Sequence, residues 1–263
     1  MIYVWDVWGD ARVVISGNWV MSNVAGTSDS GDGGGLYIGN ADGVEVIDNI
    51  VLSNTGCYTN GHAYGGGVFL SSSDGAILSG NRIEHNVGQR GVGPSGSYGG
   101  GVSLWNSADV VFSRNVLRHN IASAVMADGN GGGLYVTGID RMRVDQNTFE
   151  GNRGAPTPHG AGGAIYAIDA TDLQLEANWL LRNSAAQGGA LTVRSGTIFT
   201  MTNNILAENA GWASGGALEV RPGSTRPATG TLLHNSFRPT TTAATRGRAP
   251  SGLGMQAWCS PTT

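Results

Sequence analysis

The chain has 263 residues, of which only 13% are charged, and its formal net charge is −4. Its basic residues are scattered rather than clustered, which argues against a nucleic-acid partner. No apolar run is long enough for a transmembrane segment, and no signal peptide is visible at Met1. The 44 glycines would suggest disorder if they had no period. They recur at regular intervals, which indicates an internal repeat.

The first unit of this repeat is marked by Asn18 and Asn23. These two asparagines have the spacing of five residues that recurs in every complete unit further along the chain. We therefore expect a first coil at the start of the chain. Counting back from Asn18 places Val4 where later coils have the third residue of a glycine signal.

From residue 33 onward, a Gly-Gly-x signal opens each coil and asparagines follow it. In the first six signals, one asparagine comes 14 residues after the third signal residue, and a second comes 5 residues later. An insertion over 221–230 delays the next asparagine to Asn235. The signals lie at 33–35, 65–67, 99–101, 131–133, 162–164, 188–190 and 215–217. The paired asparagines are Asn49 and Asn54, Asn81 and Asn86, Asn115 and Asn120, Asn147 and Asn152, Asn178 and Asn183, and Asn204 and Asn209.

Almost all of the variation in coil length falls in one segment. The first asparagines of consecutive coils are 26 to 34 residues apart, whereas the arc from signal to second asparagine is constant in six coils. The free length lies between the second asparagine and the next signal. A fixed arc with one variable loop is typical of a solenoid, whose insertions fall on one face.

Within the fixed arc, apolar residues alternate as they do in strands. Positions five and three before the first asparagine, and two after it, are almost always apolar, as in Val44, Val46 and Val51. The strand after each glycine pair adds two more, such as Leu36 and Ile38. The sequence therefore predicts an all-β fold, a right-handed parallel β-helix of about eight coils over residues 1–239. We expect an irregular or disordered tail over 240–263.

The asparagine and glycine columns have a structural interpretation. Equivalent positions in successive coils stack about 4.8 Å apart, so an inward asparagine can donate its amide to the next asparagine and accept from the previous one. Asparagine also tolerates the left-handed conformation that a sharp corner can require. Glycine permits positive φ and close stacking of backbones.

The repeat resembles that of the polymorphic outer-membrane protein family, which pairs a Gly-Gly-Ala-Ile type motif with a Phe-x-x-Asn motif. The residues that carry the resemblance are Gly-Gly-Ala-Ile at 162–165, Gly-Gly-Ala-Leu at 188–191 and 215–218, and Phe-Glu-Gly-Asn at 149–152. More broadly, the repeat is similar to pectin-lyase-like β-helix proteins, over about residues 4–237. The resemblance implies an extracellular or cell-surface domain that is often adhesive and sometimes acts on polysaccharides. Because no signal sequence precedes the first coil, we expect the chain to be a fragment of a longer protein.

One outward column of the predicted helix is aromatic. Tyr37, Phe69, Tyr135 and Tyr166 lie two residues beyond the glycine signal, and Ser103 interrupts them. A flat aromatic strip can stack on sugar rings, so these four are the candidate ligand-binding residues, in two short platforms. The alternative is plain cross-strand packing, which aromatic residues favour, with the variable loop covering the rings.

A pair of carboxylates offers a weaker candidate for catalysis. Asp145 and Glu176 share one outward position in neighbouring coils, and Arg143 lies two residues before Asp145. Two close carboxylates can act as acid and base. The alternative is a solvated face with local charge pairing, which contributes little. The Gly-His-Gly and Arg-Ile-Lys motifs that we associate with polygalacturonases do not occur.

Metal binding has less support, and no cofactor is expected. His85 and His119 stack at one position of neighbouring coils but lack a third ligand in that column. Four residues in Gly-rich loops raise the alternative of calcium, although turn chemistry explains them better. They are Asp29, Asp32, Asp128 and Asn130. The sequence also leaves open a disulfide between Cys57 and Cys259, and the role of the outward tryptophans among Trp5, Trp8, Trp19, Trp105 and Trp179.

These features favour a non-catalytic extracellular or cell-surface β-helix that presents a long face for adhesion or polysaccharide contact. The alternative is a polysaccharide lyase, hydrolase or epimerase of the pectin-lyase-like type, which a groove lined by carboxylates would favour. A third interpretation is a structural spacer, which small, polar, loop-covered outward columns would favour.

Overall fold

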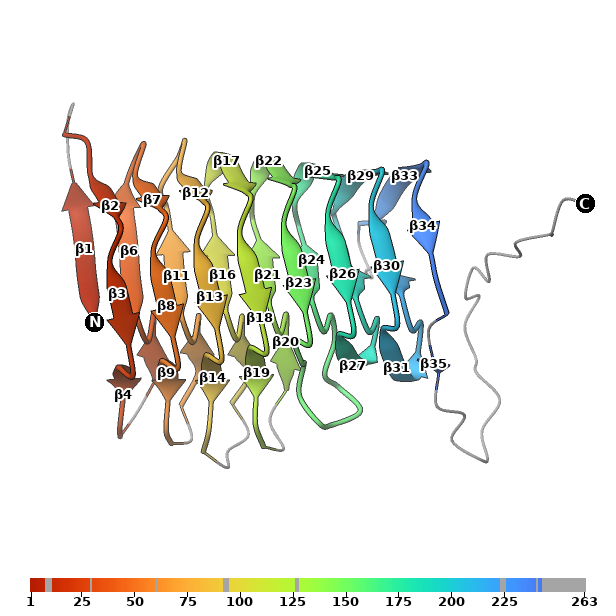
Figure 1. The fold of residues 1–263 in the computed structure, drawn as a ribbon, viewed down its shortest axis with the longest axis horizontal. Helices are drawn as coiled ribbons and strands as arrows, with labels where there is room; N and C mark the ends of the chain where they lie inside the picture. Colours follow the sequence, from red (N-terminus) through yellow and green to blue (C-terminus); the bar gives the residue numbers. More distant parts are fainter. Residues whose placement is uncertain are drawn as a thin grey trace, which may run out of the picture.

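The computed structural model describes residues 1–7, 11–28, 30–59, 61–91, 95–125, 128–222, 226–239 and 241–242. Within these residues the secondary structure is entirely β, and the strands of each sheet pair in parallel, coil after coil, along one axis (Figure 1). This confirms the predicted parallel β-helix. The described residues contain no helix of the length and apolarity that a membrane crossing needs.

Each coil contributes one strand to each of three long sheets. Every one of these sheets has eight strands in chain order, in agreement with the expected number of coils. Sheet 1 contains β1 (Ile2–Val7), β6 (Leu36–Ala41), β11 (Val68–Ser71), β16 (Val102–Trp105), β21 (Leu134–Thr137), β24 (Ile165–Ile168), β28 (Leu191–Val193) and β32 (Leu218–Val220). Sheet 2 contains β2 (Val14–Ser16), β7 (Glu45–Ile47), β12 (Ile77–Ser79), β17 (Ala108–Ser113), β22 (Asp140–Asp145), β25 (Thr171–Glu176), β29 (Ile198–Thr202) and β33 (Thr229–Leu233). Sheet 3 contains β3 (Trp19–Met21), β8 (Ile50–Leu52), β13 (Arg82–Glu84), β18 (Val116–Arg118), β23 (Thr148–Glu150), β26 (Trp179–Leu181), β30 (Ile205–Ala207) and β34 (Ser236–Phe237).

Shorter strands flank the variable loop, which lies along the lower edge in Figure 1. The strands after the second asparagine are β4 (Val24–Gly26), β9 (Thr55–Cys57), β14 (Val87–Gln89) and β19 (Ile121–Ser123). The strands before the glycine pair are β5 (Gly31–Asp32), β10 (Ala63–Tyr64), β15 (Ser97–Tyr98) and β20 (Gly129–Asn130). In the last coils, β27 (Ser184–Gln187), β31 (Ala210–Ser214) and β35 (Thr241–Thr242) form a further sheet. The rest of the predicted tail, residues 240 and 243–263, lies outside the described residues.

The core lies between the three long sheets. Val44, Val46 and Val51 are at most 1% exposed, and the equivalent residues of the later coils form one continuous cluster with them. Leu36 and Ile38 of β6 are also fully buried. The inward positions predicted from the alternation are therefore confirmed. Burial of this apolar surface is the main force that closes each coil on its neighbours.

Both asparagine columns form hydrogen-bonded ladders. Asn115 is buried, donates its amide to Asn147 Oδ1 at 3.2 Å and to Leu78 O at 2.9 Å, and accepts from the backbone N–H and the amide of Asn81. The same pattern repeats through the inner coils and reaches Asn18 at one end of the ladder. The predicted columns are confirmed, because each amide finds partners above and below.

The left-handed conformation at the corners does not belong to the ladder asparagines, although asparagine tolerates it. It belongs to the residue before each one, such as Asp48 with φ of 55°, Arg114 with 53° and His119 with 53°. That preceding residue turns the backbone. The asparagine can then keep ordinary dihedral angles and point its side chain into the ladder.

The first coil is confirmed, but Val4 does not occupy the predicted position. Val4 pairs with Ile38, whereas Ile2 is the partner of Leu36, directly after the glycine signal. In the first coil, the arc from Ile2 to Asn18 is therefore three residues longer than the equivalent arc from Leu36 to Asn49. Segment 8–10, whose structure is not described, lies in this longer arc.

Candidate functional site: an aromatic corner beside sheet 1

The predicted aromatic column lies on the outer face of sheet 1. Parallel pairing aligns Tyr37 with Phe69, and Tyr135 with Tyr166, in adjacent coils. Ser103 stands between the two pairs. The column starts with Tyr3 and continues beyond Tyr166 as Thr192 and Glu219.

These rings are not the open strip that the sequence suggested. Phe69, Tyr135 and Tyr166 are only 6–7% exposed, and Tyr37 is half-buried. The cover comes from the strands before the glycine pairs. Gly65 and Gly99 have φ of 67° and 79°, and the tyrosines directly before them, Tyr64 and Tyr98, place their rings against Phe69 and Tyr135. Three of the four candidates therefore serve mainly as packing beneath other side chains.

The covering side chains are themselves aromatic. Tyr64 of β10 and Tyr98 of β15 stack on each other, with ring centroids 5.4 Å apart. Tyr64 contacts Phe69 at 5.8 Å, and Tyr98 contacts Tyr135 at 5.0 Å. Both tyrosines are half-buried, so part of each ring faces solvent. Sequence reasoning missed them because they lie at the end of the variable loop. Their shared position, directly before a glycine pair, was the available signal.

The gap at Ser103 is filled by Trp105. Its Nε1 donates a hydrogen bond of 2.9 Å to Ser103 Oγ, and its ring contacts Tyr64 at 4.7 Å and Tyr135 at 6.1 Å. The two expected platforms are thus one continuous surface, which we call the aromatic corner. It consists of Tyr3, Tyr37, Tyr64, Phe69, Tyr98, Trp105, Tyr135 and Tyr166.

An acidic residue lies at the N-terminal end of the aromatic corner. Asp32 of β5 pairs with Tyr64, and its Oδ1 is buried with no hydrogen-bond partner among the residues that the structure describes. Burial raises the pKa of Asp32, although a backbone hydrogen bond of Tyr64 and the charge of His62 act in the opposite direction. The His62 ring stacks on Tyr64 at 6.2 Å. A desolvated carboxyl group beside an imidazole is a candidate for proton transfer.

The predicted carboxylate pair lies on a different sheet. Asp145 and Glu176 are partners on β22 and β25 of sheet 2, as expected. The Glu176 side chain is 52% exposed but that of Asp145 is only 8% exposed, which corrects the expectation of two solvated carboxylates. Arg143 Nε lies 3.3 Å from Asp145 Oδ1, and Arg143 Nη2 lies 3.8 Å from Glu176 Oε2. One arginine thus balances both charges, on a face that does not include the aromatic corner.

The candidate metal ligands do not converge. His85 and His119 are exposed and stack with centroids 5.1 Å apart, so their rings lie nearly parallel and their nitrogen lone pairs do not point at one ion. Asp32 and Asn130 lie on opposite edges of the sheet β20-β15-β10-β5. Among the residues that the structure describes, no group of three or more His, Cys, Asp or Glu side chains is placed to hold a metal ion.

Of the two cysteines and the other remaining sequence candidates, some lie outside the described residues. Asp29, Trp8 and Cys259 belong to the part of the chain that is not described. Cys57 is buried, and its Sγ lies 3.6 Å from Thr59 Oγ1.

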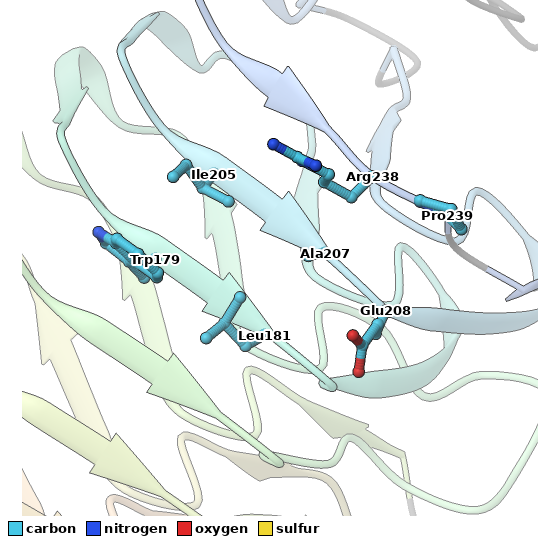
Figure 2. Close-up of a pocket in the computed structure, with 7 residues that line it drawn as sticks. All are labelled: Trp179, Leu181, Ile205, Ala207, Glu208, Arg238 and Pro239. Carbon is cyan, nitrogen blue, oxygen red and sulfur yellow. The ribbon is translucent and has the colours of Figure 1, made fainter.

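A shallow hollow of about 370 Å³ lies on sheet 3, away from the aromatic corner (Figure 2). Trp179, which is 52% exposed, and Ile205 line it from neighbouring strands, and Arg238 and Glu208 lie at its rim. Its walls are mostly aliphatic. The hollow has one flat ring but no series of aromatic contacts, so it offers less area for a polymer than the aromatic corner does.

Comparison with known proteins supports the fold. Residues 35–237 match the family model described as the right handed beta helix region. The chain belongs to this family of right-handed β-helices. The narrower resemblance to polymorphic outer-membrane proteins stays a prediction. No curated protein matches the sequence of this β-helix.

Solved structures of similar shape include enzymes. The β-helix is similar to the catalytic unit of a GH87 α-1,3-glucanase from Streptomyces thermodiastaticus, with 15% identity, a TM-score of 0.34, and coverage of 88% of this chain and 50% of that one. It is also similar to the A-module of a mannuronan C-5 epimerase from Azotobacter vinelandii, with 12% identity, a TM-score of 0.30 and coverage of 90% of both chains. At these values the likeness concerns the solenoid shape and carries no argument about activity.

Proposed function

We propose that this β-helix binds an extended polysaccharide along the aromatic corner, outside the cell or at its surface. The observation that supports the proposal is the unbroken series of ring contacts from Tyr3 to Tyr166. This series spans five coil spacings, or roughly 24 Å. A row of rings of that length suits a polymer, since a small ligand requires enclosure.

The half-buried rings supply the contact surface. Tyr37, Tyr64, Tyr98 and Trp105 are held by their neighbours beneath, so they lose little side-chain entropy on binding. Each exposed ring face offers an apolar surface on which a sugar ring can stack. Several weak contacts along one chain then add by avidity.

Retention on insoluble polysaccharides tests this proposal. The wild-type protein should be retained on at least one member of a panel of plant, algal and bacterial polymers. The double variant Tyr98→Ala, Trp105→Ala should be retained about tenfold more weakly. Trp179→Ala is the matched control, because it removes an exposed aromatic residue from sheet 3 and should bind normally. Equal retention of all three proteins would overturn the proposal.

A second candidate function is a polysaccharide lyase, hydrolase or epimerase. The observation that favours it is Asp32, whose raised pKa suits a general acid and whose buried Oδ1 has no partner in the described part of the chain. New reducing ends, unsaturated products or inverted sugar centres after incubation with a retained polymer would establish the activity. Asp32→Asn should then abolish turnover while leaving retention intact. A polymer that is retained but unchanged would leave binding as the function.

A further inference from the structure

We infer that the C-terminal end of the aromatic corner is a subsite for an anionic sugar, held through its carboxylate or sulfate group by Arg194. This inference rests on the proposed polysaccharide function and adds the substrate class. Three features carry it: the alignment of two arginines on sheet 1, the absence of a side-chain partner for Arg194 among the described residues, and the proximity of Tyr166.

Coil stacking brings Arg194 and Arg221 together. Arg194 directly follows β28, and its backbone N–H donates to Ala167 O at 2.8 Å. Arg221 follows β32 in the next coil, and its N–H donates to Val193 O at 2.9 Å. The two arginines are therefore in register on neighbouring coils, about 4.8 Å apart along the axis. Both belong to the outward column that contains Trp105.

Their charges are balanced unequally. Arg221 pairs with Glu219, which is 8% exposed at its side chain and accepts a hydrogen bond of 2.6 Å from Ser214 Oγ. Arg194 forms no ion pair within the described residues, and its Nε is buried without a hydrogen-bond partner. Because Nε is covered, the terminal amino groups of Arg194 are the donors available to a ligand. The end of the corner thus carries one uncompensated positive charge, although the chain as a whole is acidic.

Tyr166 links this charge to the aromatic surface. Its ring stacks on Tyr135, with centroids 5.3 Å apart and planes 7° apart. Burial raises the pKa of Tyr166, and the nearby charges of Arg194 and Arg221 lower it. A planar guanidinium beside a stacked aromatic ring can bind the charged group of a sugar while the neighbouring rings of the corner contact the polymer.

The opposite end of the corner has the opposite charge. Asp32 lies beside Tyr64, five coils away from Arg194 or roughly 24 Å along the axis. In its ionised form the Asp32 carboxylate disfavours the charged groups that Arg194 attracts. An anionic polymer should therefore be held mainly at the C-terminal end.

Binding to matched polymers tests the subsite with the full chain. The probes are polygalacturonate, the same polymer after reduction of its carboxyl groups, and dextran sulfate with plain dextran as its neutral partner. Arg194→Gln should weaken binding to a charged polymer about tenfold and binding to its neutral partner less than about twofold. Arg153→Gln is the control, since Arg153 is exposed and no side-chain partner is found for it in the described part of the chain. Preference for polygalacturonate would identify a carboxylate ligand, and preference for dextran sulfate a sulfate ligand.

Glu219→Gln provides a test in the opposite direction. It removes the negative charge beside the subsite while keeping the shape of the side chain, so binding to the charged polymer should become several-fold tighter. A structural role for these residues alone would not produce tighter binding. Equal binding of charged and neutral polymers, or equal losses on both for Arg194→Gln, would overturn the subsite and leave the proposed function standing. A loss of all binding in the double variant Tyr98→Ala, Trp105→Ala, together with unchanged binding in Arg194→Gln, would likewise overturn the subsite and leave the proposed function standing.

Discussion

Trp105 Nε1 donates a hydrogen bond of 2.9 Å to Ser103 Oγ, two positions earlier on the same strand. Ser103 lies between Phe69 and Tyr135 in the register of sheet 1. The serine is therefore not a break in the aromatic surface. Its small side chain leaves room for the indole, which is held in place by the hydroxyl and spans the gap.

This hydrogen bond predicts that substitutions at Ser103 and Trp105 have coupled effects on the free energy of unfolding. Ser103→Ala leaves Trp105 Nε1 without its acceptor and should lower the free energy of unfolding by about 1 kcal/mol. In a Trp105→Phe background the same substitution should cost almost nothing, because the donor is absent. Urea unfolding of the two single variants and the double variant measures the coupling. Additive costs would show that the hydrogen bond contributes no stability.

The asparagine ladder should be most sensitive at its centre. Asn115→Ala removes two donated and two accepted hydrogen bonds among buried groups, so it should cost about 3 kcal/mol or more. Asn235→Ala is the control at the half-buried end of the ladder, where fewer bonds are lost. Denaturant midpoints compare the two. A smaller loss for Asn115 than for Asn235 would contradict the ladder as a source of stability.

The second glycine of a signal should be less tolerant than the third. A Cβ on Gly66 would lie 2.4 Å from Val87 C and 2.5 Å from Gly100 O, both backbone atoms of other segments. Gly66→Ala should therefore lower the melting temperature strongly. Gly67→Ala is the matched control, because three other coils carry alanine at that position, although its Cβ would also lie 2.7 Å from Gly101 O. A Gly66→Ala melting temperature as high as that of the wild type would contradict the expected clash.

Asp32 should make stability depend on pH. Its pKa is raised in the folded state by burial, so the unfolded chain releases this proton more readily and folding loses stability as pH rises through the folded pKa. Asp32→Asn should therefore stabilise the protein at neutral pH. The difference should shrink below about pH 4, where the unfolded carboxyl is also protonated. Melting curves at both pH values measure this, with Asp128→Asn as the control for loss of one charge. A constant difference across pH would be the contrary result.

Asp145→Asn should leave polysaccharide retention and any turnover unchanged. Asp145 lies on sheet 2, where Arg143 already balances its charge, and it contributes nothing to the aromatic corner. The retention and turnover of Asp145→Asn, measured beside the wild-type protein, test this prediction. Lost turnover on an acidic polysaccharide would return the carboxylate pair of Asp145 and Glu176 to the position of candidate active site.

The sequence by itself determined the solenoid, its eight coils, the inward apolar positions and both asparagine ladders. Each of these depends on residues at fixed distances within one arc, and stacking at the strand spacing converts a repeated position into a column. Asn49 and Asn81 could be assigned to the same ladder without any knowledge of tertiary structure, because the arc before each of them has the same length.

Only the tertiary structure decided which aromatic rings are exposed. Tyr64 and Tyr98 end a loop of variable length, so their spacing from Phe69 and Tyr135 shows no regular pattern. Whether they lie over sheet 1 depends on the direction of the turn at Gly65 and its equivalents, and permissive φ at glycine allows more than one direction. The sequence also did not show the burial of Asp32 or the unequal pairing of Arg194 and Arg221. They depend on side chains from different coils and loops meeting at a corner, and such contacts are set by packing rather than by the period.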